Sequence, residues 1–163
     1  MHLYLGGPMF SAAEVAYNLR LAAKLRTFGY TVYCPNESEP TNDKTRTDIT
    51  AQTIYLADIE ALEASNVLIC QVSEDSGTNW EAGYMDCLST RVDPHRYYGV
   101  IGLATDIRLR TLPDPTKTGV NNQAWHINAL VVGGLQRSLG VYLDEDAMIV
   151  RLAEIQRERE GND

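Results

Sequence analysis

The sequence predicts an α/β fold: a doubly wound, five-stranded parallel sheet of the flavodoxin or Rossmann type, with helices on both faces. Two observations predict it. Short apolar runs alternate along the chain with longer segments of helical spacing, an order typical of parallel sheets with helical crossovers. One of these runs, residues 66–72, is rich in branched residues and is followed by turn formers, as is usual for a strand buried on both faces.

Two strands are predicted near the N-terminus. The first, residues 3–5, stops at the Gly-Gly-Pro turn of residues 6–8. This turn lacks the G-x-G-x-x-G spacing, so no dinucleotide cofactor is expected. The second strand, residues 30–34, is stopped by Pro35. With the helix between them, the two strands form a βαβ unit.

The helix between these strands is predicted to begin at Ser11 and to end near Gly29. Ser11 and Glu14 have the spacing of a capping box, in which each side chain bonds to the backbone of the other residue. Helical periodicity predicts a buried face that carries Val15, Leu19, Ala22 and Ala23.

The next helix is predicted over residues 48–64, after an irregular, turn-rich loop at 36–47. Ile54, Asp58 and Leu62 follow one another at intervals of four residues, which places an acid on an apolar stripe. Burial of a lone carboxylate is costly. We therefore expect Asp58 either at the rim of the core or facing a cavity where a polar group meets it.

Two carboxylates, Asp75 and Glu81, follow the strand at 66–72. A helix is predicted over 80–88, so both acids are expected at the carboxyl edge of the sheet, where doubly wound proteins bind ligands. Thr78 and Glu81 also have capping-box spacing, which gives Glu81 a structural interpretation beside a chemical one. The two are compatible, because the dipole at a helix start keeps a carboxylate ionised.

The second half of the chain completes the alternation of strands and helices. A strand is predicted at 97–103, an irregular stretch at 104–123, a helix from Asn128, a short strand at 140–143, and a final helix capped by Asp144. The charged residues 156–163 are expected to fray.

Composition restricts the class of protein. The chain has 163 residues, 44% hydrophobic and 22% charged, and is expected to form one domain over residues 1–163. The net charge of -8 disfavours nucleic acids and anionic membranes as partners. Neither a signal peptide nor an apolar run of membrane-spanning length is evident, so no membrane association is expected.

Cysteine and histidine usage point to a cytoplasmic protein without a metal site. Cys34, Cys70 and Cys87 are odd in number and lie among apolar neighbours, which favours reduced core thiols over disulfides. The three histidines lack the spacing of metal ligands.

Four segments of the sequence together resemble the nucleoside 2-deoxyribosyltransferase family. They are YLGGPMF at residues 4–10, Asp58 in its helix, the D-x-G-T-x-x-E-x-G-Y run at 75–84, and NAL at 128–130. The resemblance extends over nearly the whole chain, and the run at 75–84 is its most specific part. It implies transfer of a 2-deoxyribosyl group from one nucleobase to another, with 2'-deoxynucleosides and free nucleobases as substrates and no cofactor.

The resemblance also implies roles for particular residues. Glu81 corresponds to the nucleophile that forms a covalent deoxyribosyl-enzyme, and Tyr4 to the tyrosine that orients it. Asp58 corresponds to the acid that contacts the base and gives it a proton. Asn128 corresponds to an asparagine that a neighbouring subunit contributes to the sugar's 5' end, which implies a homo-oligomer. The substrate-binding residues implied are Asp75, which holds the sugar hydroxyls, Asn128, Gly7, Pro8, Phe10 and Glu39, with Glu37 as a close competitor of Glu39.

Glycosyl transfer with retention needs carboxyl groups in two protonation states. Asp58 delivers a proton to the departing base only if its surroundings raise its pKa, as an apolar stripe does. Glu81 needs to be ionised, and a helix start is expected to keep it so.

Two other functions stay open. Related N-glycosidases hydrolyse nucleoside 5'-monophosphates, but they tend to carry a neutral residue where this chain has Asp75, because a fixed carboxylate repels a 5'-phosphate. A non-catalytic nucleoside-binding module on the same fold is the other alternative.

Overall fold

The computed structural model describes residues 1–38, 43, 45–106 and 127–161 of the chain. In these residues five parallel strands form one sheet in the order β2-β1-β3-β4-β5, which confirms the predicted fold class. The strands are β1 (His2–Gly6), β2 (Thr31–Tyr33), β3 (Val67–Gln71), β4 (Gly99–Leu103) and β5 (Val141–Tyr142). The helices are α1 (Ala12–Thr27), α3 (Ala51–Glu63), α4 (Ser76–Cys87), α5 (Ala129–Arg137) and α6 (Glu145–Glu160), with a 3-10 turn η1 (Pro35–Glu37) and a π-helical turn η2 (Leu88–Val92).

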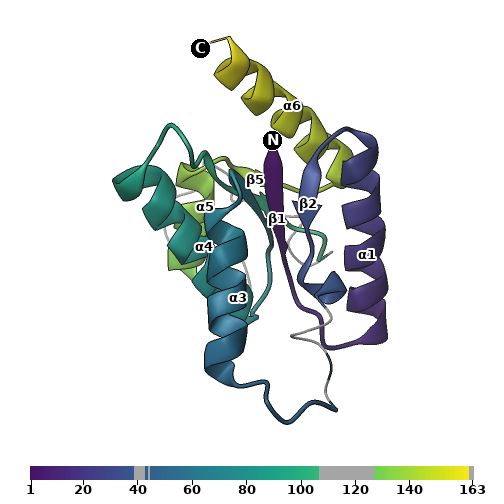
Figure 1. Ribbon diagram of the computed structural model, residues 1–163. Helices are drawn as coiled ribbons and strands as arrows, with labels where there is room; N and C mark the ends of the chain where they lie inside the picture. Colours follow the sequence, from purple (N-terminus) through teal and green to yellow (C-terminus); the bar gives the residue numbers. More distant parts are fainter. Residues whose placement is uncertain (39–42, 44, 107–126, 162–163) are drawn as a thin grey trace.

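Helices cover both faces of the sheet (Figure 1). Side chains alternate between the faces along each strand. In β1, Leu3 and Leu5 therefore pack into the apolar cluster under α1 and α6, whereas Tyr4 packs into the cluster under α3, α4 and α5. This alternation directs the Tyr4 side chain toward the helices that carry Asp58 and Glu81.

The site lies where the sheet changes its winding direction. From β1 the chain moves outward to β2 on one side, then returns past β1 to β3 and continues to β4 on the other side. The connections that leave the carboxyl ends of β1 and β3 therefore run to opposite sides, and doubly wound proteins bind ligands in the crevice that results. The Gly-Gly-Pro turn follows β1, and Asp75 follows β3.

The capping predictions for α1 and α6 are confirmed, but of the residues predicted on the buried face of α1 only Ala22 is buried. Ser11 and Glu14 form a full capping box, and the Asp144 side chain caps α6. The residues that α1 buries are Asn18, Leu21, Ala22 and Leu25, whereas Leu19 and Ala23 are exposed. The face is rotated because a polar residue, Asn18, is accommodated in the core by hydrogen bonds.

One further prediction needs correction, and another is not tested. Helix α6 continues to Glu160, and fraying of residues 156–163 stays a prediction. Cys34 and Cys70 are buried free thiols, but Cys87 is exposed at the end of α4. Glu39 and most of the predicted irregular stretch at 104–123 lie outside the described residues.

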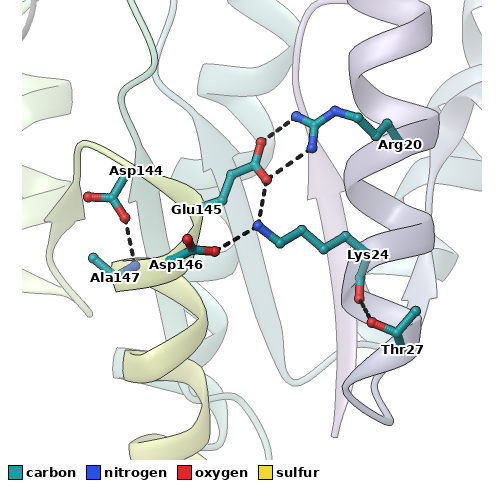
Figure 2. A network of polar contacts seen from close by, with 7 residues as sticks. All are labelled: Arg20, Lys24, Thr27, Asp144, Glu145, Asp146 and Ala147. Atoms are coloured by element: carbon teal, nitrogen blue, oxygen red, sulfur yellow. Dashed lines mark hydrogen bonds and ion pairs between the residues drawn. The ribbon is translucent and has the colours of Figure 1, made fainter.

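A network of charges joins α1 to α6 (Figure 2). Lys24 Nζ lies 3.0 Å from Glu145 Oε2 and 2.8 Å from Asp146 Oδ1, and the Arg20 guanidinium donates to both oxygens of Glu145. These hydrogen bonds, above all those from Arg20, lower the pKa of Glu145 to about 2. The Glu145 side chain is only 15% exposed, whereas that of Asp146 is 86% exposed.

Glu145→Gln is expected to lower the free energy of unfolding by about 1 kcal/mol at neutral pH, a figure that allows for solvent screening of these groups. Because the pKa of Glu145 is depressed from 4.5 to about 2, its contribution is present above pH 4.5 and is lost as the pH falls toward 2. Denaturant unfolding at several pH values measures this. The control Asp146→Asn, at an exposed partner of the same lysine, should change stability less.

Candidate active site

Glu81 and Tyr4 form the centre of the candidate site. The Tyr4 hydroxyl donates a hydrogen bond of 2.7 Å to Glu81 Oε1, and the Tyr4 side chain is fully buried. The Tyr33 ring stacks on the Tyr4 ring at a centroid distance of 5.1 Å. A donor held this firmly limits the orientations available to the Glu81 carboxylate. The contact joins β1 to α4 and is therefore invisible to local sequence patterns.

The predicted capping role of Glu81 is wrong. The N-cap of α4 is Asp75, and its Oδ2 accepts from the Thr78 backbone N–H at 2.8 Å and from the Thr78 hydroxyl at 2.6 Å. The helix therefore begins at Ser76, four residues earlier than the predicted start at residue 80. Glu81 then lies in the second turn, and its carboxylate bonds to Tyr4 instead of the helix terminus.

The expectation that Glu81 has a low pKa is also wrong. Burial, together with the neighbouring charges of Asp58 and Asp75, raises the pKa of Glu81 to about 7, although the Tyr4 hydrogen bond opposes the shift. Because Glu81 lies in the second turn, the helix dipole stabilises its charged form less than it would in the first turn. Desolvation of the charged form therefore outweighs the favourable contacts.

Asp58 lies on α3, half buried, in the same pocket as Glu81. Burial raises the pKa of Asp58 above its usual range, and contact with the Tyr4 hydroxyl opposes the shift. The direction agrees with the sequence prediction, and of the two positions considered, the one facing a cavity is correct. Both carboxyl groups interact with the Tyr4 hydroxyl, and the charge of Asp58 raises the pKa of Glu81, so we treat the two as an interacting pair.

These groups open onto a pocket of about 180 Å³. Asp58 on α3, Asp75 at the N-cap of α4 and Glu81 on α4 supply its carboxylates, whereas the segment after β1 and the η1 turn supply mainly apolar lining residues, the apolar wall. Phe10 stands at the mouth, 81% exposed. The residues that line the pocket are Gly7, Met9, Phe10, Pro35, Ile54, Asp58, Asp75, Gly77, Thr78 and Glu81.

The remaining predicted residues lie outside this pocket. Tyr4 is buried behind Glu81, and Pro8 lines a neighbouring pocket of about 460 Å³. Asn128 is exposed at the start of α5, where its Oδ1 caps the helix by accepting from the Leu130 N–H at 2.9 Å. The described part of the chain thus brings Glu81, Tyr4, Asp58, Asp75, Gly7 and Phe10 together, and leaves Pro8 and Asn128 apart from them.

Two glycines, Gly6 at the end of β1 and Gly7 directly after it, allow close packing at the site, and the sequence analysis did not identify Gly6. A Cβ on Gly6 would lie 2.7 Å from Glu81 Oε2, so only glycine lets the carboxylate rest against this strand. A Cβ on Gly7 would lie 2.4 Å from Gln71 Nε2. Consecutive glycines between a strand and a proline were the available signal for a close approach of this kind.

Two negative findings concern only the described residues. They contain no group of three or more His, Cys, Asp and Glu side chains arranged to hold a metal ion. They also contain no helix of the length and apolarity needed to cross a membrane.

Two carboxyl groups facing one pocket, one of them oriented by a buried tyrosine hydroxyl, are an arrangement that enzymes acting on glycosidic bonds use. Residues 3–117 match the family model described as nucleoside 2-deoxyribosyltransferase. This match covers more than half of the 163 residues, so the chain belongs to the nucleoside 2-deoxyribosyltransferase family.

Several solved structures have a similar fold. A conserved protein from Enterococcus faecalis V583 has a TM-score of 0.71 at 25% identity, with 94% of this chain and 97% of that one covered. A 2-deoxyribosyltransferase from Bacillus psychrosaccharolyticus has a TM-score of 0.57 at 19% identity, covering 88% and 87%. A 2-desoxiribosyltransferase from Leishmania mexicana has a TM-score of 0.61 at 19% identity, covering 94% and 97%. A search of curated proteins found no significant match.

Proposed function

We propose that this protein transfers the 2-deoxyribosyl group of a 2'-deoxynucleoside to a free nucleobase through a covalent intermediate on Glu81. Membership of the family supports a deoxyribosyltransferase type of activity on nucleosides and nucleobases. The observation that carries the mechanism is the 2.7 Å hydrogen bond from Tyr4 to Glu81 Oε1, which leaves Oε2 for the sugar.

In the proposed first half-reaction the ionised Glu81 Oε2 attacks C1'. The C1'–Oε2 bond forms as the bond from C1' to the base nitrogen breaks, and Asp58 gives its proton to the departing base. In the second half-reaction the incoming base attacks C1', Glu81 leaves as a carboxylate, and Asp58 recovers a proton from the base. Two inversions at C1' retain its configuration.

Asp75 supports a substrate without a 5'-phosphate. Its Oδ2 is occupied by the two contacts to Thr78, so Oδ1 is the oxygen we assign to a sugar hydroxyl. Among the described residues that line the pocket there are three carboxylates and no Lys, Arg or His. A phosphate dianion there would be repelled, which disfavours nucleotide hydrolysis.

The function is tested by mixing the protein with deoxyinosine and adenine, with no cofactor added. The expected products are deoxyadenosine and hypoxanthine, in amounts that depend on the presence of both substrates. Release of free deoxyribose without exchange indicates the hydrolase alternative. Nucleoside binding without any product indicates the non-catalytic module.

The pH dependence of kcat/KM for exchange is expected to be bell-shaped, with its alkaline limb near pH 7. The reacting form carries one proton on the coupled pair of Glu81 and Asp58. Above a pKa of about 7 both groups ionise and Asp58 has no proton to give the base. In acid both are protonated and the nucleophile is lost. Initial rates across the pH range measure this, and a rate that continues to rise well above neutrality would contradict the assignment.

We propose that Asn128 acts in the site of a neighbouring copy. It is exposed and lies outside the pocket of its own subunit, while the adjacent Leu130 is 84% exposed and borders an apolar groove of about 280 Å³ between α4 and α5. An exposed leucine over an apolar groove is typical of a contact surface.

A mixing experiment tests this assembly. Asn128→Ser keeps a side chain able to cap α5 but is too short to reach a neighbouring site, so the variant is expected to fold and to lose most activity. Mixed with an inactive Glu81 variant under conditions that exchange subunits, it is expected to recover activity, since hybrid sites contain both intact residues. No recovery after confirmed exchange would place both residues in one subunit.

A further inference from the structure

A buried asparagine on α1 joins the segments that follow the first three strands. Asn18 is 2% exposed. Its Nδ2 donates to the Pro8 carbonyl at 3.0 Å and to Asn36 Oδ1 at 2.8 Å, while its Oδ1 accepts from Gln71 Nε2 at 2.7 Å. Pro8 follows β1, Asn36 lies in η1 after β2, and Gln71 ends β3. One side chain therefore holds three parts of the carboxyl edge at fixed separations.

These hydrogen bonds reach only one part of the pocket lining, the apolar wall. Gly7, Met9 and Phe10 flank Pro8 in sequence, and Pro35 precedes Asn36. All four line the pocket that also contains the carboxylates. The reacting groups are anchored separately, since Tyr4 and Glu81 bond to each other and Asp75 bonds to Thr78.

Burial of the Asn18 amide costs free energy, and the structure of α1 alone does not explain why a polar residue lies there. An amide buried in a helix face lowers stability unless its donors and acceptor are satisfied. Asn18 uses both of its amide functions on partners outside α1, and Gln71 in turn packs against Gly7, whose missing Cβ makes room for it. The amide pair thus sets how closely the turn after β1 approaches the end of β3.

We propose that Asn18 is a positioning residue for nucleoside binding: it fixes the apolar wall of the pocket relative to the carboxylates without touching the substrate. The inference rests on the proposed function of the same pocket. Loosening this wall weakens the binding of substrate and transition state alike, which raises KM and leaves kcat nearly unchanged. A residue that only stabilises the fold affects neither constant while the protein remains folded.

The test compares Asn18→Ala and Asn36→Ala with a stability control. Asn36→Ala removes only the hydrogen bond from Asn18 to η1, so the inference can still be tested if Asn18→Ala does not fold. Leu152→Ala, in the core under α6, lowers stability far from the pocket. We expect KM for the deoxynucleoside to rise about tenfold in Asn36→Ala, as for the loss of one hydrogen bond, and at least as much in Asn18→Ala, which removes all three bonds, with kcat within about threefold in both. The double variant should resemble Asn18→Ala alone, because both changes remove the same bond.

Wild-type KM in Asn36→Ala, or an equal effect in Leu152→Ala, would overturn the inference. If the wild-type protein exchanges no bases, the proposed function fails and calorimetric binding of deoxyinosine becomes the readout. Weaker binding of about tenfold in Asn36→Ala then still supports the positioning role, and undiminished binding refutes it. Absence of any binding to the wild-type protein refutes both proposals.

Discussion

Glu81→Gln is expected to lower kcat for base exchange by at least about 10³-fold, since it removes the nucleophile. The amide is nearly the same size as the carboxylate and its oxygen still accepts the hydrogen bond of 2.7 Å from Tyr4. The buried hydroxyl therefore keeps its partner, and the fold is expected to survive. The substitution also removes a group whose ionised form is disfavoured by burial.

A second tyrosine–glutamate pair provides a matched control. The Tyr84 hydroxyl donates to Glu63 Oε1 at 2.5 Å, on the exposed surface between α3 and α4. Glu63→Gln changes the same chemical contact outside the pocket, so kcat is expected to stay at the wild-type value. Exchange at an undiminished rate in Glu81→Gln would refute the assignment of Glu81 as the nucleophile.

Asp58→Asn is expected to lower kcat by about 10²- to 10⁴-fold for donors with an ordinary nucleobase, because the departing base no longer receives a proton. The loss should depend on the leaving group. A deoxyribosyl donor whose leaving group departs as a stable anion needs no proton, so the variant should release it nearly as fast as the wild-type protein. The alkaline limb of the pH profile of kcat/KM should also disappear, because the variant lacks the acid at position 58.

The control for this variant is Glu60→Gln, at an exposed position on the same helix. It changes a carboxylate on α3 without altering the pocket, and kinetics like those of the wild type are expected. An equal loss of rate for good and poor leaving groups in Asp58→Asn would show that Asp58 does not act as the proton donor.

The fold was predictable because its signals are local. Alternating apolar runs and helical segments identified all five strands within a few residues of their ends, and the capping residues Ser11 and Asp144 marked two helix starts correctly. The change of winding direction at β1 also follows from topology rules that hold for parallel sheets in general. The site was therefore expected at the edge of the sheet where the pocket lined by Asp58, Asp75 and Glu81 lies.

The errors arose where long-range contacts override local patterns. Asp75 and Thr78 are both able to cap a helix, and only the structure shows that Asp75 does so, which releases Glu81 to meet Tyr4. The face of α1 was misassigned because hydrophobic periodicity cannot recognise a buried Asn18 with partners on other elements. The raised pKa of Glu81 comes from burial, which is a property of the tertiary structure.

The most direct measurement of the central claim is the mass of the protein after incubation with a 2'-deoxynucleoside and no acceptor base. The account predicts an increase equal to one deoxyribosyl group, located by peptide mapping on the segment that contains Glu81 and reversed when a nucleobase is added. The same increase should be absent from Glu81→Gln and present in Glu63→Gln. A wild-type protein that exchanges bases while its mass stays unchanged, or that carries the sugar on another residue, would contradict the account.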